Sequence, residues 1–316
     1  MSADPQYIPR VFNERLSPST PYDCAVIGGG PGGIATALYL RRYHRSVIVF
    51  DAAQSRARWI PRSHNCPGFP HGISGTALLA RLREQAASFD VRPVEATVVQ
   101  LHQRAGTFTL VDDQGLACAA ATVVLATGVV DVLPAESWIS AAISTGAIGL
   151  CAICDAFEAS GQRLAVYGPI NSAISHAVFL RSYSHQVCAI ASDDQPPDPD
   201  KDRLASEAGI TLYTKPRALS YDGEHCSIIR ASGEHCVFDV LYPAMGSRSQ
   251  SSLARHLGAE VDDNAELVVS SRQMTSVAQL YAVGDVVSAI NQIAVASGHA
   301  AIAATAIHNS LPRRWR

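Results

Sequence analysis

The sequence lacks a strong excess of either charge, long apolar runs and a dense set of cysteines. With 25 Lys and Arg against 28 Asp and Glu, its formal net charge is −3, so the charge indicates neither a nucleic acid nor an anionic membrane as a partner. No apolar run approaches the roughly 18 residues that a membrane-spanning helix needs. The chain of 316 residues is too long for one typical domain and suits two.

The N-terminal segment lacks the features of a cleaved leader. Residues 1–20 are mixed polar and contain Pro5, Pro9 and Pro18, without an apolar centre or a small-residue cleavage site. We therefore reject a signal peptide and expect a cytoplasmic protein. We interpret residues 1–20 as an extended arm, either disordered or lying on a neighbouring subunit.

Eight cysteines are spread along the chain, and six of them stand alone in apolar or loop segments. An isolated cysteine is an ordinary core residue, and a secreted disulfide scaffold would be shorter and denser in cysteine. Cys151 and Cys154 differ because only two residues separate them, a spacing that indicates redox or metal chemistry. Zinc needs four ligands. The sequence offers no second Cys-x-x-Cys and no His-x-x-x-His, so we expect redox chemistry and no metal.

The order of the expected elements predicts an α/β protein with two Rossmann-like folds. Each fold begins with a strand, a turn, a helical pattern and a second strand, which is a βαβ unit with parallel strands. The first unit comprises a strand at 22–27, a helix at 34–43 and a strand at 46–50; the second comprises a strand at 164–167, a helix around 172–183 and a strand at 186–190. Further strands are expected at 122–125 and 280–283, and a polar loop at 193–202.

The first glycine loop, Gly28-x-Gly30-x-x-Gly33, lies between an expected strand and an expected helix. In this context the first glycine permits a tight turn, the second lets the backbone approach a diphosphate, and the third lets the helix pack on the sheet. The helix N-terminus, beginning near Pro31, then faces the negative charge. Asp51 ends the next strand, where a ribose-binding acid is expected. The loop therefore predicts a dinucleotide site.

Two later segments resemble those of the flavoprotein disulfide reductases that have two dinucleotide-binding folds. Ala126-Thr127-Gly128 follows an expected strand, and Gly284-Asp285 ends another. In that family the first segment approaches the cofactor near the domain crossover. The aspartate of the second hydrogen-bonds the ribityl chain or the diphosphate of the flavin. The resemblance implies FAD as the cofactor of the first glycine loop.

The segment around the close cysteine pair is similar to the active-site segment of the low-molecular-weight thioredoxin reductases, in which Cys-x-x-Cys-Asp leads into a helix. Here it reads Cys151-Ala-Ile-Cys154-Asp155, and the two intervening residues place both sulfurs on one turn, near enough for a disulfide. The resemblance implies that Cys154 lies next to the flavin, that Cys151 exchanges with an external disulfide, and that Asp155 protonates the leaving thiolate. Near neutrality that role requires a carboxyl pKa raised by burial.

Other segments extend this resemblance over most of the chain. The loop that begins at Asn65 matches a flavin-contacting loop of the family, and the stretch containing Gln292 and Ile293 matches the one that closes over the isoalloxazine. His299 opens the last helix at a position where thioredoxin reductases usually have a small residue. There it could favour an anionic reduced flavin or carry protons between flavin and dithiol. The alternative is a histidine that only packs or caps.

The second βαβ unit departs from the family, which binds NADPH at this place. Its loop has Ile170 at the position of the middle glycine, and we expect the branched side chain to project where the diphosphate meets the backbone. Pro169 removes an N–H donor, and Asp193 follows the next strand where the family has arginines for the 2′-phosphate. NADPH is therefore not expected, although the charge alone does not exclude NADH.

The resemblance implies a discontinuous FAD-binding domain at 21–129 and 247–316, an inserted domain at 130–246 that carries the dithiol, and a homodimer. The expected function is an FAD-dependent disulfide/dithiol oxidoreductase acting on a small thiol or a thioredoxin-like protein, independently of NADPH. Relatives without the nucleotide site use ferredoxin, oxygen or a second flavin, and the sequence does not choose among them. Two alternatives remain: an NADPH-dependent thioredoxin reductase with a divergent loop, and a flavin-loaded sensor without turnover.

Overall fold

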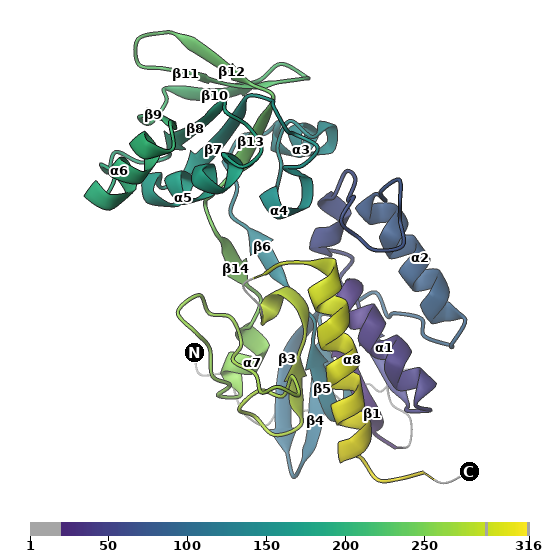
Figure 1. Cartoon of the computed structure of the whole chain (residues 1–316). Helices are drawn as coiled ribbons and strands as arrows, with labels where there is room; N and C mark the ends of the chain where they lie inside the picture. The colour runs from purple at the N-terminus through teal and green to yellow at the C-terminus, as the bar shows by residue number, and fades with distance from the viewer. Residues whose placement is uncertain (1–19, 288–289, 315–316) are drawn as a thin grey trace. The chain divides into compact units, whose positions relative to one another are not determined.

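The computed structural model describes residues 20–287 and 290–314 (Figure 1). The arm expected at 1–20 lies, except for its last residue, outside the described residues. The chain forms two compact units. Unit 1 comprises Met1–Arg58, Thr76–Val130 and Arg248–Arg316, and unit 2 comprises Trp59–Gly75 and Asp131–Ser247.

Unit 1 is built on a sheet with the strand order β2-β1-β5-β4-β3, in which β15 also pairs with β5 (Figure 1). Parallel pairing joins β2, β1, β5 and β15, while β4 and β3 extend the sheet in antiparallel fashion. The strands are β1 (Tyr22–Ile27), β2 (Val47–Phe50), β3 (Val98–Arg104), β4 (Thr107–Asp112), β5 (Ala117–Leu125) and β15 (Leu280–Ala282). The helices are α1 (Pro31–Arg42), α2 (Gly75–Ala87), α7 (Ser252–His256) and α8 (Ile293–Ser310), with the 3-10 turns η1 (Arg56–Trp59) and η2 (Gly284–Val286).

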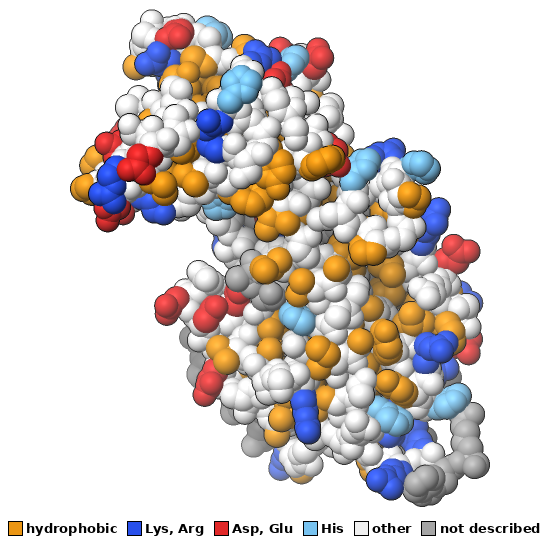
Figure 2. Space-filling model, viewed as in Figure 1, with side chains coloured by type: hydrophobic (Ala, Val, Ile, Leu, Met, Phe, Trp, Pro, Cys, Tyr) orange, Lys and Arg blue, Asp and Glu red, His pale blue; other side chains and the backbone are white. Residues whose placement is uncertain are grey.

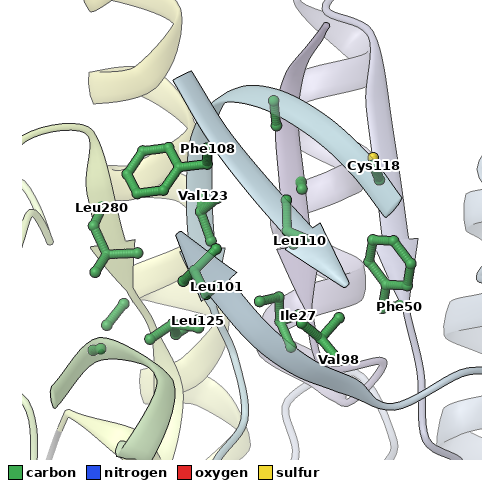
Figure 3. Close-up of a cluster of buried hydrophobic side chains, with 14 of the residues drawn as sticks. Ile27, Phe50, Val98, Leu101, Phe108, Leu110, Cys118, Val123, Leu125 and Leu280 are labelled. Carbon is green, nitrogen blue, oxygen red and sulfur yellow. The ribbon is translucent and has the colours of Figure 1, made fainter. Parts of the chain in front are cut away.

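The central strands of unit 1 are buried on both faces, as expected for parallel strands covered on both sides. In β1, Cys24 and Val26 belong to one apolar cluster with residues of α1 and α8. Ala25 and Ile27 belong to the cluster on the other face, which Figure 3 shows with Phe108, Leu110 and Leu280 among its members. The side chains of β1 thus alternate between two buried clusters, and the glycine turn begins directly at the end of this strand.

Unit 2 has a four-stranded parallel sheet with the order β13-β7-β8-β9 and a three-stranded antiparallel sheet, β10-β11-β12. The strands are β7 (Leu164–Gly168), β8 (Val187–Ala191), β9 (Thr211–Tyr213), β10 (Ala218–Tyr221), β11 (Cys226–Ile229), β12 (His235–Phe238) and β13 (Val240–Pro243). The helices are α3 (Ile139–Thr145), α4 (Ala152–Asp155), α5 (Ile170–Leu180) and α6 (Pro199–Glu207). The chain passes from one unit to the other within β6 (Val129–Asp131) and β14 (Ser247–Ser249), and these two strands pair with each other.

The two βαβ units expected from the sequence are present as β1-α1-β2 and β7-α5-β8, each with parallel strands. The polar loop expected at 193–202 is shorter than predicted because α6 begins at Pro199. Asp198 at the N-cap, proline in the first turn and two early acids all favour a helix start there. None of the helices in the described part of the chain combines the length and apolar character that a membrane crossing requires.

Candidate active site

The first glycine turn is pressed against the end of β5. The N–H of Gly28 donates to the Phe50 carbonyl at 2.8 Å, and its φ of +117° is one that side chains rarely adopt. A Cβ on Gly28 would overlap the Ala126 carbonyl oxygen, and one on Gly33 would overlap the Gly28 carbonyl oxygen. The backbone thus approaches as closely as the fingerprint predicts, with Gly30 as the N-cap of α1.

Asp51 lies beside this turn, directly after β2, and is buried. Its Oδ2 accepts a hydrogen bond from Arg83 Nη2 at 2.9 Å, and its Oδ1 accepts one from the Ala53 N–H, also at 2.9 Å. Because each carboxylate oxygen can accept two hydrogen bonds, both can still receive a ribose hydroxyl. Arg83 was not singled out in the sequence, because it lies on a distant helix and carries no local motif.

The other unit 1 candidates follow the carboxyl ends of neighbouring parallel strands. The N–H of Ala126 donates to the Ile27 carbonyl at 2.8 Å. The N–H of Val283, just before Gly284, donates to the Leu125 carbonyl at 2.9 Å. This edge is where open α/β sheets bind ligands. Thr127 and Gly128 continue from Ala126, and the Thr127 hydroxyl donates to the Gln250 carbonyl at 2.7 Å.

Asp285 lies in η2, and its Oδ2 is 3.8 Å from Arg56 Nη1. After Arg83, Arg56 is the second arginine of this site that the sequence analysis did not identify. The N–H of Gly284 donates to Nδ1 of His299 at 3.3 Å, which joins η2 to α8. Burial lowers the pKa of His299. A neutral imidazole that accepts at Nδ1 carries its proton on Nε2. A direct action of His299 on the flavin stays a prediction.

Gln292 is the N-cap of α8 and Ile293 its first residue, so the helix begins earlier than predicted and His299 lies within it rather than at its start. Gln292 accepts the N–H of Ala296 at 3.0 Å through its carbonyl, which starts the helix. The edge formed by the glycine turn, Asp51, Ala126–Gly128 and Asp285 fits a dinucleotide, since Gly28 and Gly33 sit where an added Cβ would overlap backbone and the two acids accept hydroxyl donors. The contacts of each residue with FAD stay predictions.

The structure forms the disulfide between Cys151 and Cys154 in unit 2, with an S–S distance of 2.05 Å and a Cα–Cα distance of 5.3 Å. The N–H of Cys154 donates to the Cys151 carbonyl at 2.8 Å and opens the short helix α4. Ile153 and Phe157 beside it are 60% and 78% exposed. Hydrophobic side chains accordingly lie on the surface at α4 (Figure 2). The pair is therefore flanked by apolar groups.

Asp155 ends α4 one residue after Cys154. Its Oδ1 accepts a hydrogen bond from the Tyr242 hydroxyl at 2.8 Å. Burial raises the pKa of Asp155 to about 6, the Tyr242 hydrogen bond lowers it and the charge of Glu158 raises it. A carboxyl in this range can both hold and release a proton near neutrality, as the role expected from the resemblance requires.

Asn65 falls in a different unit from the glycine turn. The segment Trp59–Gly75 groups with unit 2, whereas the sequence prediction included it in the FAD-binding portion. There the Ser63 hydroxyl donates to Asn65 Oδ1 at 2.9 Å, and Ser63 bridges to Ile73 in antiparallel fashion. The structure thus defines the fold of this loop, and a contact of Asn65 with the flavin stays a prediction.

The second turn, between β7 and α5, differs from the first. Pro169 is the N-cap of α5 and has no N–H to offer. The side chain of Ile170 is only 5% exposed and belongs to the apolar cluster of unit 2 with Ala173 and Ile174. The expectation that it would project above the turn was wrong, because burial in this cluster stabilises an apolar side chain. Gly168 is retained because a Cβ there would overlap Ala244.

An acidic loop follows β8 beside this turn. Asp193 and Asp194 stand at its start, with Lys215 3.5 Å from Asp194. The N–H of Asp198 donates to Asn171 Oδ1 at 2.9 Å, which ties the loop to the first turn of α5. A nucleotide 2′-phosphate at this strand end would meet carboxylates rather than a cluster of arginines, an unfavourable arrangement for an anion.

Comparison with known proteins agrees with this geometry. Residues 22–300 match the family described as pyridine nucleotide-disulphide oxidoreductase. The thioredoxin reductase of Mycolicibacterium smegmatis is 29% identical over 303 residues, covering 90% of this chain and 95% of that protein. The crystal structure of HlmI superposes with a TM-score of 0.85 at 23% identity, covering 92% of each chain. The atypical thioredoxin reductase TRi from Desulfovibrio vulgaris Hildenborough is 29% identical with a TM-score of 0.52, covering 92% of this chain and 97% of that one.

The family match covers most of the chain and includes both βαβ units and the cysteine pair. It confirms the fold class predicted from the sequence, two Rossmann-like dinucleotide-binding folds, and the resemblance to the thioredoxin reductases. Membership of this family implies FAD as the cofactor. The chain belongs to the pyridine nucleotide-disulphide oxidoreductase family and is a flavoprotein disulfide oxidoreductase similar to the thioredoxin reductases.

Proposed function

We propose that this chain oxidises a dithiol substrate through Cys151–Cys154 and FAD without exchanging electrons with NADPH. The observation that carries the proposal is the second nucleotide turn. It pairs a helix N-cap that lacks an N–H, Pro169, with a strand end that carries Asp193 and Asp194. The missing N–H of Pro169 removes a hydrogen-bond donor to a diphosphate, and the two aspartates stand where cations would bind a 2′-phosphate. The N-cap of the first turn, Gly30, keeps its N–H.

The residues of unit 2 supply the exchange chemistry. A substrate thiolate attacks the sulfur of Cys151, so that a mixed disulfide forms and Cys154 leaves as a thiolate. Asp155 gives this thiolate its proton. The second substrate thiol passes its proton to Asp155 as it breaks the mixed disulfide, and Cys151 leaves as a thiolate that takes up the proton released by the first substrate thiol. A substrate disulfide and two protein thiols result, so two electrons and two protons have moved. FAD, when bound, supplies the two-electron acceptor for this pair, and oxygen, ferredoxin or a second flavin accepts electrons in turn.

A second candidate is an NADPH-dependent thioredoxin reductase. Two observations favour it: the M. smegmatis relative is named thioredoxin reductase, and Ile170 is buried in the cluster of unit 2. The substrate then is a thioredoxin. In the proposed function the substrate is a small thiol or a thioredoxin-like protein, and the molecule is a homodimer like the enzymes it resembles.

NADPH binding separates the two candidates. We expect isothermal titration of the FAD-loaded protein to give a Kd for NADPH weaker than about 1 mM, a binding free energy of only about −4 kcal/mol. Asp193→Arg should tighten NADPH binding several-fold and leave NADH binding nearly unchanged, because only NADPH carries the 2′-phosphate. Glu207→Arg, an exposed change at the end of α6, serves as the charge-matched control. A micromolar Kd for the unaltered protein would contradict the proposal.

The electron acceptor is identified by turnover of the FAD-loaded protein with a small dithiol. Oxygen uptake under air, with one hydrogen peroxide formed per disulfide, identifies oxygen as the acceptor. Turnover only after addition of reducible ferredoxin identifies a carrier protein, and two flavins per chain indicate an internal acceptor. Absence of turnover with any pair of donor and acceptor favours a redox sensor.

A further inference from the structure

A buried tyrosine hydroxyl from another element reaches the dithiol segment. Tyr242 lies in β13, and its hydroxyl donates to Asp155 Oδ1 at 2.8 Å across 87 residues of sequence. Its side chain is only 3% exposed, so the hydroxyl is removed from bulk water. A buried hydroxyl needs a hydrogen-bond partner, and here that partner is the acid next to Cys154. This contact is therefore part of the buried structure around the disulfide.

The backbone before the disulfide is shaped around the same ring. A Cβ on Gly149 would overlap the ring of Tyr242, so the ring lies directly against the main chain two residues before Cys151. The N–H of Gly149 donates to the Leu241 carbonyl at 3.1 Å, and Ile148 forms a parallel bridge with Leu241. The glycine thus lets β13 hold the segment that leads into the disulfide and bring the hydroxyl to Asp155.

Two side chains in the described part of the chain act on the titration of Asp155. Besides Tyr242 from β13, the charge that acts on it is Glu158 from the turn after α4. Nδ1 of His64, from the loop grouped in the same unit, is 4.0 Å from Glu158 Oε1. Glu158 and burial both favour the neutral carboxyl, whereas the Tyr242 hydroxyl and, to a smaller extent, a backbone hydrogen bond favour the carboxylate. The hydroxyl also occupies Oδ1, which leaves Oδ2 to exchange a proton.

We propose that Tyr242 is a positioning residue of the dithiol centre, whose hydroxyl fixes the Asp155 carboxyl beside Cys154 and decides at which pH it yields its proton to the leaving thiolate. This inference rests on the part of the proposed function that assigns exchange to Cys151–Cys154. It does not depend on the electron acceptor or on the absence of NADPH. A role limited to packing would require the ring of Tyr242 but not its hydroxyl.

The test measures reduction of the Cys151–Cys154 disulfide by a water-soluble phosphine between pH 4 and pH 9 in the FAD-loaded protein, with the thiols quantified by alkylation and mass spectrometry. Tyr242→Phe keeps the ring and removes the hydroxyl, so the pKa of Asp155 should rise. The protonated acid then persists to a pH roughly one unit higher. The ratio of the variant rate to the unaltered rate should therefore rise with pH. It should be about fivefold above its low-pH value one unit above the pH of about 6 at which Asp155 ionises in the unaltered protein, and approach about tenfold at higher pH.

Tyr221→Phe is the matched control, because that hydroxyl contacts Gly223 and Thr145 rather than Asp155. Its rate ratio should not vary with pH. In an Asp155→Asn background, Tyr242→Phe should also give a ratio independent of pH. If Tyr242→Phe folds poorly, fluorotyrosine in place of Tyr242 supplies a more acidic hydroxyl and should shift the profile to lower pH. A rate ratio for Tyr242→Phe that does not change with pH, or a rise with pH that persists without Asp155, overturns the inference.

If the phosphine profile shifts as described while NADPH binds tightly, the proposed function fails and the role of Tyr242 stands. If NADPH does not bind and the pH profile does not move, the proposed function stands and the role of Tyr242 fails. The two proposals therefore have separate outcomes.

Discussion

Cys154→Ser should slow the reduction of the flavin by a dithiol at least about a thousandfold, because serine offers neither the thiolate nor the disulfide that the exchange requires. Reduction is followed by loss of flavin absorbance after anaerobic mixing with an excess of dithiothreitol. In this variant Cys151 remains able to form a mixed disulfide with a thiol reagent, which mass spectrometry detects. Cys151→Ser should lose that adduct as well, since the resemblance makes Cys151 the exchanging sulfur.

Cys236→Ser is the matched control for this experiment. Cys236 is a half-buried free cysteine on β12, in the antiparallel sheet of unit 2. Its replacement removes one thiol without affecting the disulfide, so the rate of flavin reduction should stay within about twofold. Rapid flavin reduction in Cys154→Ser, within about tenfold of the unaltered protein, would show that electrons reach the flavin by another route.

Gly28→Ala should yield a protein that retains almost no FAD. The φ of +117° at Gly28 disfavours any side chain, and an added Cβ would overlap the Ala126 carbonyl at the end of β5. The turn and the strand end must move apart, and together they form the surface that meets the diphosphate. We expect the Kd for FAD to rise more than about a hundredfold, a loss of about 2.7 kcal/mol. Flavin content after desalting and fluorescence titration of the apoprotein measure this change.

Gly106→Ala is the control for backbone strain alone, without the steric overlap that an added Cβ causes at Gly28. Gly106 lies between β3 and β4 with a φ of +78°, and no atom of the described residues beyond its own neighbours would stand within 4 Å of an added Cβ there. This control should cost about 1 kcal/mol of folding stability through strain alone and leave FAD binding unchanged. Stoichiometric, tight FAD in Gly28→Ala would mean that the cofactor does not meet this turn.

The local motifs of the site were predictable because each is written in consecutive residues. Gly28 and Gly33 take the tight positions that their spacing indicates, and Asp51 follows β2 as expected. The cysteine pair forms the disulfide that its two-residue spacing allows. The family of the chain followed from the same segments. In each case the geometry depends on neighbours along the chain.

The contacts that sequence reasoning missed join distant segments. Tyr242 reaches Asp155 across 87 residues, and Arg83 reaches Asp51 across 32; neither pair has a local pattern. The prediction for Ile170 failed for a different reason. Its position in the loop was identified correctly, but the direction of its side chain depends on the cluster that α5 packs into. The early start of α6 was, by contrast, encoded locally in Asp198 and Pro199.

The central claim is that the flavin takes electrons from thiols and not from NADPH. The most direct test mixes the FAD-loaded protein anaerobically with equal excesses of NADPH and of dithiothreitol in separate stopped-flow experiments. We expect complete loss of flavin absorbance with the dithiol and a rate with NADPH lower by at least about a thousandfold, corresponding to about 4 kcal/mol of lost transition-state stabilisation. Fast, stoichiometric bleaching by NADPH would contradict the claim.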